Sequence, residues 1–321
     1  MAEAVAGTRP GTDRARVLAW LREYGVYVSV LALLVFNVAF TPNFLDAANF
    51  RTQLVQVAPI VIVSLGMALV IGTEGIDLSV GSVMALAASM VVLYLGYGAW
   101  PAILVALAAG ALVGAAGGGL VAYVGVQPIV ATLALLVGIR GLANVLVPQL
   151  RDFRSPTLIT LGSDSVAGVP YVVLIAAVLT VAMTFVVRRT TFGRQIVAIG
   201  GNRVASELSG LPVKRLLLSV YVISGVLAAG AGVLATARLQ AGDPTSLGLF
   251  MELSAITAVV IGGTPLSGGR IRVVGTVMGA MLIQLLQATL IKHDLPRSWA
   301  QIVQAVIILA AVYAAGNRGG R

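Results

Sequence analysis

Cysteine is absent from this 321-residue chain, and histidine occurs once, as His293. Without cysteine the chain can form no disulfide, no thiolate metal site and no cysteine nucleophile. A single histidine also excludes the paired-histidine sites that bind zinc, so we expect no metal or cofactor in this chain. Charged residues make up only 10% of the chain, whereas soluble domains carry about 25%. These shortages indicate a chain solvated mainly by lipid.

Apolar residues, by contrast, fill 59% of the chain, and the mean hydropathy is +1.00. A transmembrane helix needs about 20 mostly apolar residues. The sequence therefore predicts an all-α polytopic membrane protein, with a cytoplasmic tail at 1–23, a single transmembrane domain at 24–315 and a short cytoplasmic tail at 316–321. The ten predicted spans are 24–41, 53–73, 82–97, 99–123, 128–148, 169–187, 215–238, 246–263, 272–291 and 298–315.

The basic residues indicate how these spans are oriented, because cytoplasmic loops carry an excess of lysine and arginine. With the N-terminus inside, 14 of the 21 basic residues fall in cytoplasmic segments, and ten spans return the C-terminus to the same side. The 14 are Arg9, Arg14, Arg16, Arg22, Arg188, Arg189, Arg194, Arg203, Lys214, Arg215, Arg270, Arg272, Arg318 and Arg321. The net charge of +9 is thus explained by topology, and we expect no nucleic-acid partner.

Polar residues interrupt the apolar run between Pro59 and Leu95, where residues 72–82 read GTEGIDLSVGS. Charged side chains at membrane depth cost about 2.5–3.5 kcal/mol each on insertion scales, so each needs a reason. We predict a helix break beside a translocation path, with Asp77 or Ser79 capping the helix that follows. The alternative is a polar loop at the cytoplasmic face. The residues assigned to the break are Glu74, Gly75, Asp77, Ser79 and Gly81.

A second interruption reads GGTPLSGGRIR over residues 262–272. Its LSGGR differs by one letter from LSGGQ, the signature of the ATPase subunits of ABC transporters. Such an ATPase also needs the phosphate-binding loop GxxxxGK[ST], and neither lysine of this chain, Lys214 or Lys292, follows a glycine. We therefore predict no ATPase activity, and a second helix break in which glycines let the chain turn sharply. The residues assigned to it are Gly262, Gly263, Ser267, Gly268 and Gly269.

Two further charged residues fall within predicted spans. Arg140 lies in the fifth span and Glu252 near the start of the eighth. Each can find a partner of opposite charge or face a wet cavity, and we place Arg140 beside the path. The alternative for both is a side chain that extends to the membrane interface.

The longest cytoplasmic connection, residues 188–215, contains signals for a short helix. Asn202 is a favourable N-cap residue, residues 203–209 can form about two turns, and Gly210 suits the C′ position. Pro212 then prevents continuation. We predict a docking helix parallel to the membrane surface, and the alternative is an ordinary basic loop. The residues assigned to docking are Asn202, Arg203, Glu207, Leu208 and Gly210.

Five stretches together resemble the ribose-type permeases, the membrane subunits of bacterial ABC importers for monosaccharides. They occur in that family's order between about Ala39 and Ala311. The stretches are TPNFLDAANF (41–50), GIDLSVGSVMAL (75–86), IVATLALLVGIRG (129–141), FGRQIVAIGGNRVASELSGLPV (192–213) and AVVIGGTPLSGGRIRVVGTVMGAMLI (258–283). One departure is Glu74, where related permeases often have a small or hydroxyl residue.

The resemblance implies a ten-span subunit of the bacterial cytoplasmic membrane that pairs with a second copy, as a homodimer, around one central path. It implies that ATPase subunits, which bind ATP and magnesium, dock on residues 188–215. It also implies that an extracytoplasmic sugar-binding protein delivers a monosaccharide or related polyol.

Three alternatives to this function remain open from the sequence. One is a secondary transporter driven by an ion gradient, with Glu74 or Asp77 as the ion carrier. Another is an ABC permease for a different small solute, such as a branched-chain amino acid. The third, an intramembrane diacid protease, has little support because it needs aspartates on two facing helices and only Asp77 qualifies.

Overall fold

Long apolar helices account for most of the computed structural model, which describes residues 12–316. Within that range, seven helical segments are long and apolar enough to cross a membrane. They are α2 (Ala47–Gly72), α3 (Val80–Tyr94) with the 3-10 turn Leu95–Tyr97, α4 (Ala99–Gly119) with the π-helical turn Leu120–Val124, α5 (Pro128–Leu146), α7 (Tyr171–Arg189), α10 (Val213–Leu239) and α12 (Val273–Lys292). Three helices contain shorter apolar stretches: α1 (Thr12–Phe40), α11 (Met251–Ile261) and α13 (Arg297–Gly316).

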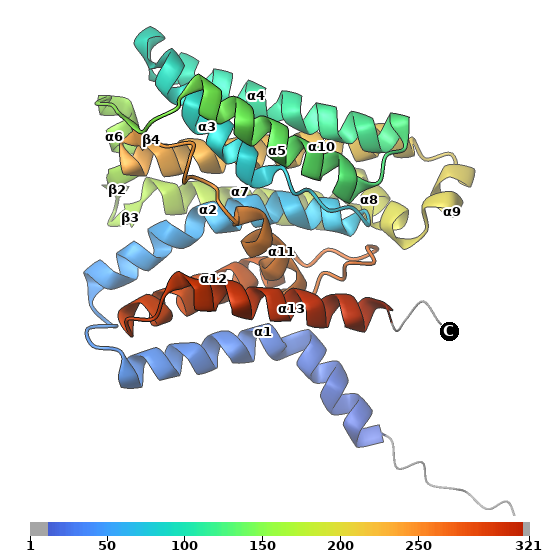
Figure 1. Ribbon diagram of the computed structural model, residues 1–321. Coiled ribbons are helices and arrows are strands. Elements are labelled where there is room, and N and C mark those ends of the chain that lie inside the picture. The colour runs from blue at the N-terminus through green and yellow to red at the C-terminus, as the bar shows by residue number, and fades with distance from the viewer. Residues whose placement is uncertain (1–11, 317–321) are drawn as a thin grey trace, which may run out of the picture.

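Short elements lie at the two ends of this helical bundle (Figure 1). At one end are α6 (Pro156–Ser163) and two small antiparallel pairs, β1 (Arg151–Asp152) with β4 (Ala241–Gly242) and β2 (Ser165–Val166) with β3 (Val169–Pro170). At the other end are α8 (Thr191–Gly201) and α9 (Arg203–Leu208), together with the start of α1 and the end of α13. Both described ends of the chain therefore lie on the side of α8 and α9.

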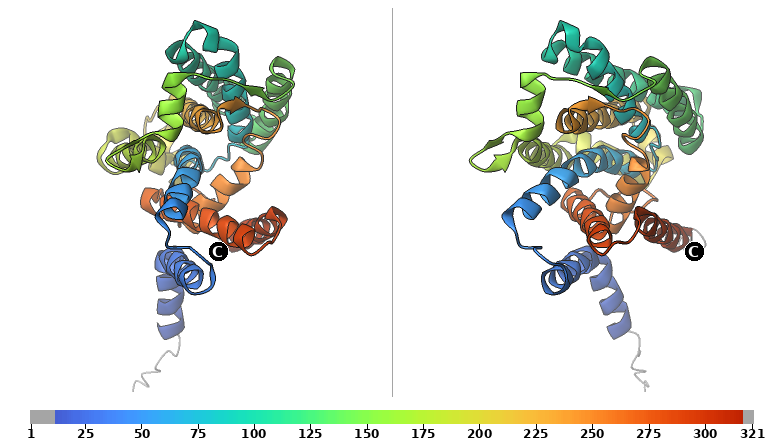
Figure 2. Two further views of the ribbon diagram at one scale, coloured as in Figure 1. Left: turned by 90° about the vertical axis from the view of Figure 1, so that its left-hand side faces the viewer. Right: turned by 60° about the vertical axis from the view of Figure 1, so that its left-hand side comes forward.

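The helices α2 and α10 form the centre of the bundle, α4 and α7 pack against them, and α1 lies at the edge against α12 (Figure 2). Every residue of α2 from Val57 to Gly72 is buried. Glycine lets α4 approach α10 closely, because a Cβ at Gly114 would collide with Tyr221 O and one at Gly118 would lie 3.0 Å from Leu218 Cα. In the same way Gly279 of α12 packs against the backbone of α11. Small residues at such spacing are a common packing device in lipid.

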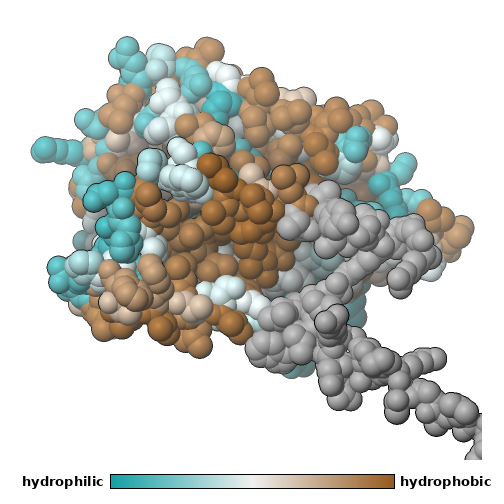
Figure 3. All heavy atoms as spheres, turned by 60° about the horizontal axis from the view of Figure 1, so that its bottom comes forward, coloured by the Kyte–Doolittle hydropathy of each residue, from teal (hydrophilic) through white to brown (hydrophobic). Residues whose placement is uncertain are grey.

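The outer surface is largely apolar, and Figure 3 shows a continuous hydrophobic region on one face, with hydrophilic side chains gathered toward its ends. Large side chains such as Val137, Val178 and Phe185 are more than 60% exposed. In water this surface would be unfavourable, whereas lipid solvates it. The surface therefore agrees with a multi-pass membrane protein.

One span predicted from the sequence is too long, and the two tails stay predictions. Residues 12–23 of the expected N-terminal tail are helical, since α1 begins at Thr12, and residues 1–11 and 317–321 lie outside the described range. The predicted span 246–263 is only the 11-residue helix α11, which is about 16 Å long and covers roughly half of the hydrocarbon core. Residues 243–250 are not helical, since Gly248 and Phe250 both have positive φ.

Candidate translocation and coupling elements

The first interruption begins where α2 ends, with a hydrogen-bond pattern that closes the helix. Gly75 N donates to Val70 O over 3.0 Å, and Glu74 N donates to Ile71 O over 2.9 Å. This is the Schellman pattern, in which the C′ residue adopts a left-handed conformation that favours glycine. Glu74 holds that position with a φ of 66°, and it is exposed. Its role in the structure is therefore to end α2 at the surface.

Asp77 organises the rest of the interruption from a buried position, with only 1% of its surface exposed. Its Oδ1 accepts hydrogen bonds from Ser79 N at 3.0 Å and Ser79 Oγ at 2.6 Å, and its Oδ2 accepts one from Ser224 Oγ at 2.8 Å. Ser79 precedes the first residue of α3 and its side chain makes no cap bond, whereas Asp77 accepts the backbone N–H of Ser79 at the start of that helix. Asp77 instead ties the segment between α2 and α3 to the middle of α10. The segment after Glu74 is therefore packed inside the bundle, whereas Glu74 itself lies at the surface.

Gly81, in the first turn of α3, is where α3 meets the loop that precedes α11. A Cβ at Gly81 would collide with Gly248 O and with Glu252 Oε2, and it would lie 3.5 Å from Arg140 Nη2. A Cβ at Gly248 would in turn collide with Gly81 O. Two glycines thus allow direct backbone contact between the start of α3 and the loop 243–250, beside the charges of Arg140 and Glu252.

Arg140 holds the loop before α11 in place from the neighbouring helix α5. Its Nη1 donates to Pro244 O over 3.1 Å and to Leu247 O over 2.6 Å. Glu252 supplies a nearby negative charge, and its Oε2 is buried without a hydrogen-bond partner among the described residues. The side chain of Arg140 is therefore engaged inside the bundle, which argues against its extending to the membrane interface.

The second interruption starts at the end of α11 and closes that helix as the first closes α2. Gly263 N donates to Val260 O over 3.0 Å, and Thr264 N donates to Val259 O over 3.2 Å, with Gly263 in the left-handed C′ position. Gly262 packs directly on Gly275 of α12.

Glycine is also required further along this second interruption. Gly268 and Gly269 have φ angles of 69° and 75°, so sharp turning explains these glycines of the LSGGR motif. Ser267, which directly precedes Gly268, is exposed. The two interruptions meet in space, since Gly269 N donates to Gly72 O over 3.1 Å.

The connection between α7 and α10 contains the predicted short helix, α9. Asn202 caps it by accepting a hydrogen bond from Ala205 N at 2.9 Å, and Gly210 follows in a left-handed conformation with a φ of 80°. Arg203 and Glu207 form an exposed ion pair at 3.4 Å. Leu208, at the end of α9, is 84% exposed and therefore accessible to a partner.

The sequence did not predict two features of this region. Residues 191–201 form the helix α8, although they were expected to be part of a loop. Its amphipathic pattern, with Ile196 and Ile199 buried and Arg194 exposed, was the available signal. Ser224, the partner of Asp77, was also missed, because a serine inside an apolar span gives no indication of what it bonds.

Comparison with known proteins identifies relatives along nearly the whole chain. The family described as "Branched-chain amino acid transport system / permease component" matches residues 49–312. The ribose import permease protein of Escherichia coli (strain K12) is 38% identical over 301 residues, which cover 92% of this chain and 94% of that protein. The fructose import permease protein of Bifidobacterium longum is 37% identical, covering 83% and 78% of the two chains. The ribose import permease protein of Bacillus subtilis is 34% identical over 91% and 92%. No solved structure matches the chain.

Proposed function

The chain belongs to the ribose-type permease family, and from that premise we propose that it is the membrane subunit of an ABC importer for a monosaccharide. The observation that carries the proposal is the match to ribose import permeases over more than nine-tenths of both chains. Relatives named for fructose, xylose and galactofuranose place the substrate among simple sugars and make a branched-chain amino acid the weaker choice. In this role the chain catalyses no reaction and forms the path.

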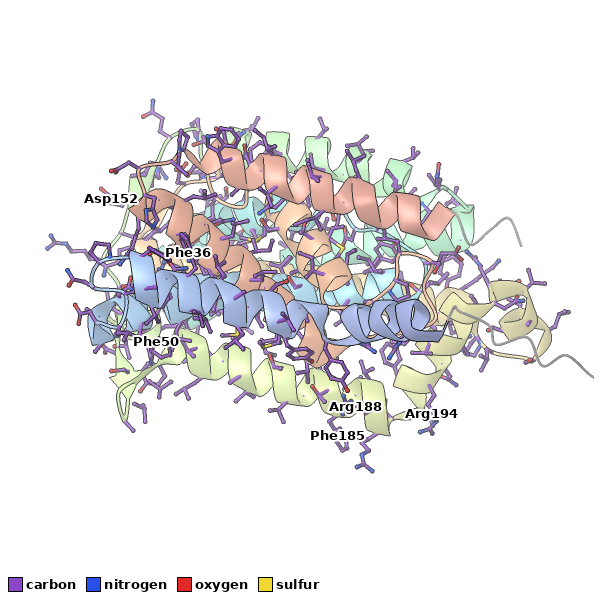
Figure 4. All side chains as sticks on the ribbon, turned by 90° about the horizontal axis from the view of Figure 1, so that it is seen from below. Phe36, Phe50, Asp152, Phe185, Arg188 and Arg194 are labelled. Atoms are coloured by element: carbon purple, nitrogen blue, oxygen red, sulfur yellow. The ribbon has the colours of Figure 1, made fainter. Side chains whose placement is uncertain are left out.

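We propose that ten helical segments cross or enter the bacterial cytoplasmic membrane, with both termini inside. The end that carries α8 and α9 is assigned to the cytoplasm because basic residues gather there. Figure 4 supports this assignment, since Arg188 and Arg194 lie at that end and Asp152 lies at the opposite one. The loop 243–250 and the half-length helix α11 then enter the membrane from the outer side, as broken elements do beside the paths of transporters.

Energy enters, in this proposal, through partner subunits. ATPase subunits dock on α9, with Leu208 as the apolar contact and Arg203 and Glu207 at its edge. ATP binding and hydrolysis by those subunits tilt two copies of the permease between inward-open and outward-open states. A sugar-binding protein outside the cell delivers the substrate to the strand end of the bundle. The chain itself holds no nucleotide, because it lacks a phosphate-binding lysine loop.

Reconstitution tests the proposal against the secondary transporter. The permease, its ATPase and its sugar-binding protein are assembled in liposomes, and labelled sugar is followed with ATP or with an imposed proton gradient. We expect uptake that needs ATP and the binding protein, and no ATP hydrolysis by the permease alone. Uptake that follows the gradient without ATP would refute the proposal.

A further inference from the structure

We propose that Gly200 of α8 is the point at which movement of α8 and α9 reaches both helix interruptions at once. The inference rests on the proposed function, since it assigns to α9 the task of receiving force from an ATPase. Its basis is a meeting of three chain segments, here called the glycine junction and made of Gly72, Gly200, Gly268 and Gly269.

The glycine junction is a contact of backbone with backbone. Gly269 N donates to Gly72 O over 3.1 Å. A Cβ at Gly200 would collide with that same Gly72 O and would lie 2.5 Å from Gly269 N. A Cβ at Gly268 would lie 2.9 Å from both Gly200 O and Glu74 N. The three segments therefore touch without any side chain between them.

Such a contact transmits displacement directly. Side chains between two helices can change rotamer and absorb a small shift, whereas close-packed backbone has no comparable freedom. Gly72, Gly200 and Gly268 are all buried, so no water layer separates them. Gly200 is followed by Gly201 and then by Asn202, the cap of α9, so a rotation of α9 acts on Gly200 across two residues.

The two groups that touch Gly200 belong to different interruptions. Gly72 is the last residue of α2 and immediately precedes the segment that Asp77 anchors. Gly269 lies in the loop that joins α11 to α12. At its other end α11 is preceded by Gly248, which contacts Gly81 of α3. Both ends of the half-length helix α11 are thus linked to the segment that joins α2 to α3. A displacement at the glycine junction therefore moves α11 and that segment together.

The test compares two neighbouring glycines of α8. A Cβ at Gly201 would meet nothing within 4 Å, and neither Gly200 nor Gly201 has a positive φ. Gly201→Ala is therefore the matched control for Gly200→Ala. Each variant is assembled with the ATPase and the binding protein, and three quantities are measured: recovery of the ATPase with the permease, ATP-driven uptake, and stimulation of ATP hydrolysis by the binding protein.

We expect both variants to retain the ATPase, since the exposed face of α9 is unchanged. Gly201→Ala should transport as the wild type does. Gly200→Ala should lose uptake and stimulation by about tenfold, within the usual range of coupling between distant sites. Equal transport by the two variants would overturn the inference. Loss of the ATPase from Gly200→Ala would also overturn it, because Gly200 would then belong to the docking surface alone. If the wild type shows no ATP-driven uptake, the proposed function itself has failed.

A second pair of variants addresses the case in which Gly200→Ala does not fold. A Cβ at Gly72 would meet only side-chain atoms of one residue, Ile271, with Cδ1 at 2.5 Å. We expect Gly72→Ala to reduce stimulation and the double variant Gly72→Ala, Ile271→Ala to restore it, because the shorter side chain makes room. Wild-type stimulation in Gly72→Ala, or a double variant as impaired as the single one, would refute the linkage between the two interruptions.

Discussion

At the residue scale, Asp77 and Glu74 are three positions apart and lie in opposite surroundings. Asp77 is buried and accepts three hydrogen bonds, whereas Glu74 is exposed and has a positive φ. Buried polar groups are stable only when their hydrogen bonds are made, so the three donors to Asp77 explain its presence inside the bundle. The exposure of Glu74 does not suit a buried ion carrier.

Replacing Asp77 is expected to damage both folding and transport. A typical buried hydrogen bond contributes about 1 kcal/mol net, so Asp77→Ala, which removes three of them, should destabilise the protein by about 3 kcal/mol. Asp77→Asn should be milder, because its amide oxygen still accepts from Ser79 and its amide nitrogen can donate to Ser224 Oγ. Thermal unfolding in detergent and ATP-driven uptake measure the effect. Asp164→Ala, at an exposed position in the strand end, is the control, and equal behaviour of all three variants would contradict this role.

Replacing Glu74 is expected to leave transport intact. Glycine suits the left-handed C′ position better than glutamate, so Glu74→Gly should preserve or slightly raise the unfolding temperature, with a gain of at most about 1 kcal/mol. Glu74→Ala keeps the strain and removes the carboxylate. Both variants should show wild-type ATP-driven uptake. Loss of uptake in both would restore Glu74 as a candidate ion carrier.

At the scale of elements, α11 depends on its neighbours because 11 residues make a helix of marginal stability alone. Contacts with α2 and α12 bury its sides, and Arg140 fixes the loop before it. A broken helix of this kind needs every exposed backbone group satisfied by protein, since lipid offers no hydrogen bonds. The side chain of Arg140 does this for two carbonyl groups.

We expect Arg140→Gln to release the loop 243–250. The loss of two charge-assisted bonds should cost about 3 kcal/mol of stability and reduce uptake, while the ATPase still associates through α9. The control is Arg51→Gln, because Arg51 Nη2 donates to Ser163 O over 2.9 Å in an exposed setting where the bond is worth less than about 1 kcal/mol. Thermal unfolding and uptake distinguish the two. Similar small losses in both variants would show that Arg140 does not support the loop.

At the scale of the whole molecule, the opposite positions of the strand end and of α8 and α9 make the topology testable in a chain without cysteine. Ser165→Cys lies exposed in β2, and Leu208→Cys lies exposed in α9. A membrane-impermeant maleimide added to intact cells should label the first variant and should label the second only after the membrane is opened. Labelling of both from outside would contradict the proposed orientation.

Local signals in the sequence determined the apolar helices, the two interruptions and the short helix α9. An apolar run, an Asn202 cap and a Gly210 in the left-handed position each act within a few residues, so they are readable without a structure. The same holds for the glycines of LSGGR, whose turn is local.

Only the tertiary structure decided which of these elements meet. The bond from Ser224 to Asp77 spans 147 positions of the chain, and the contact of Gly200 with Gly72 and Gly269 joins three distant segments. The predicted span 246–263 is likewise reduced to α11 in the structure. Arg140, from the different helix α5, binds the preceding loop in a non-helical conformation. Packing among distant segments sets these contacts, and the order of residues along one segment does not encode the partner it will touch.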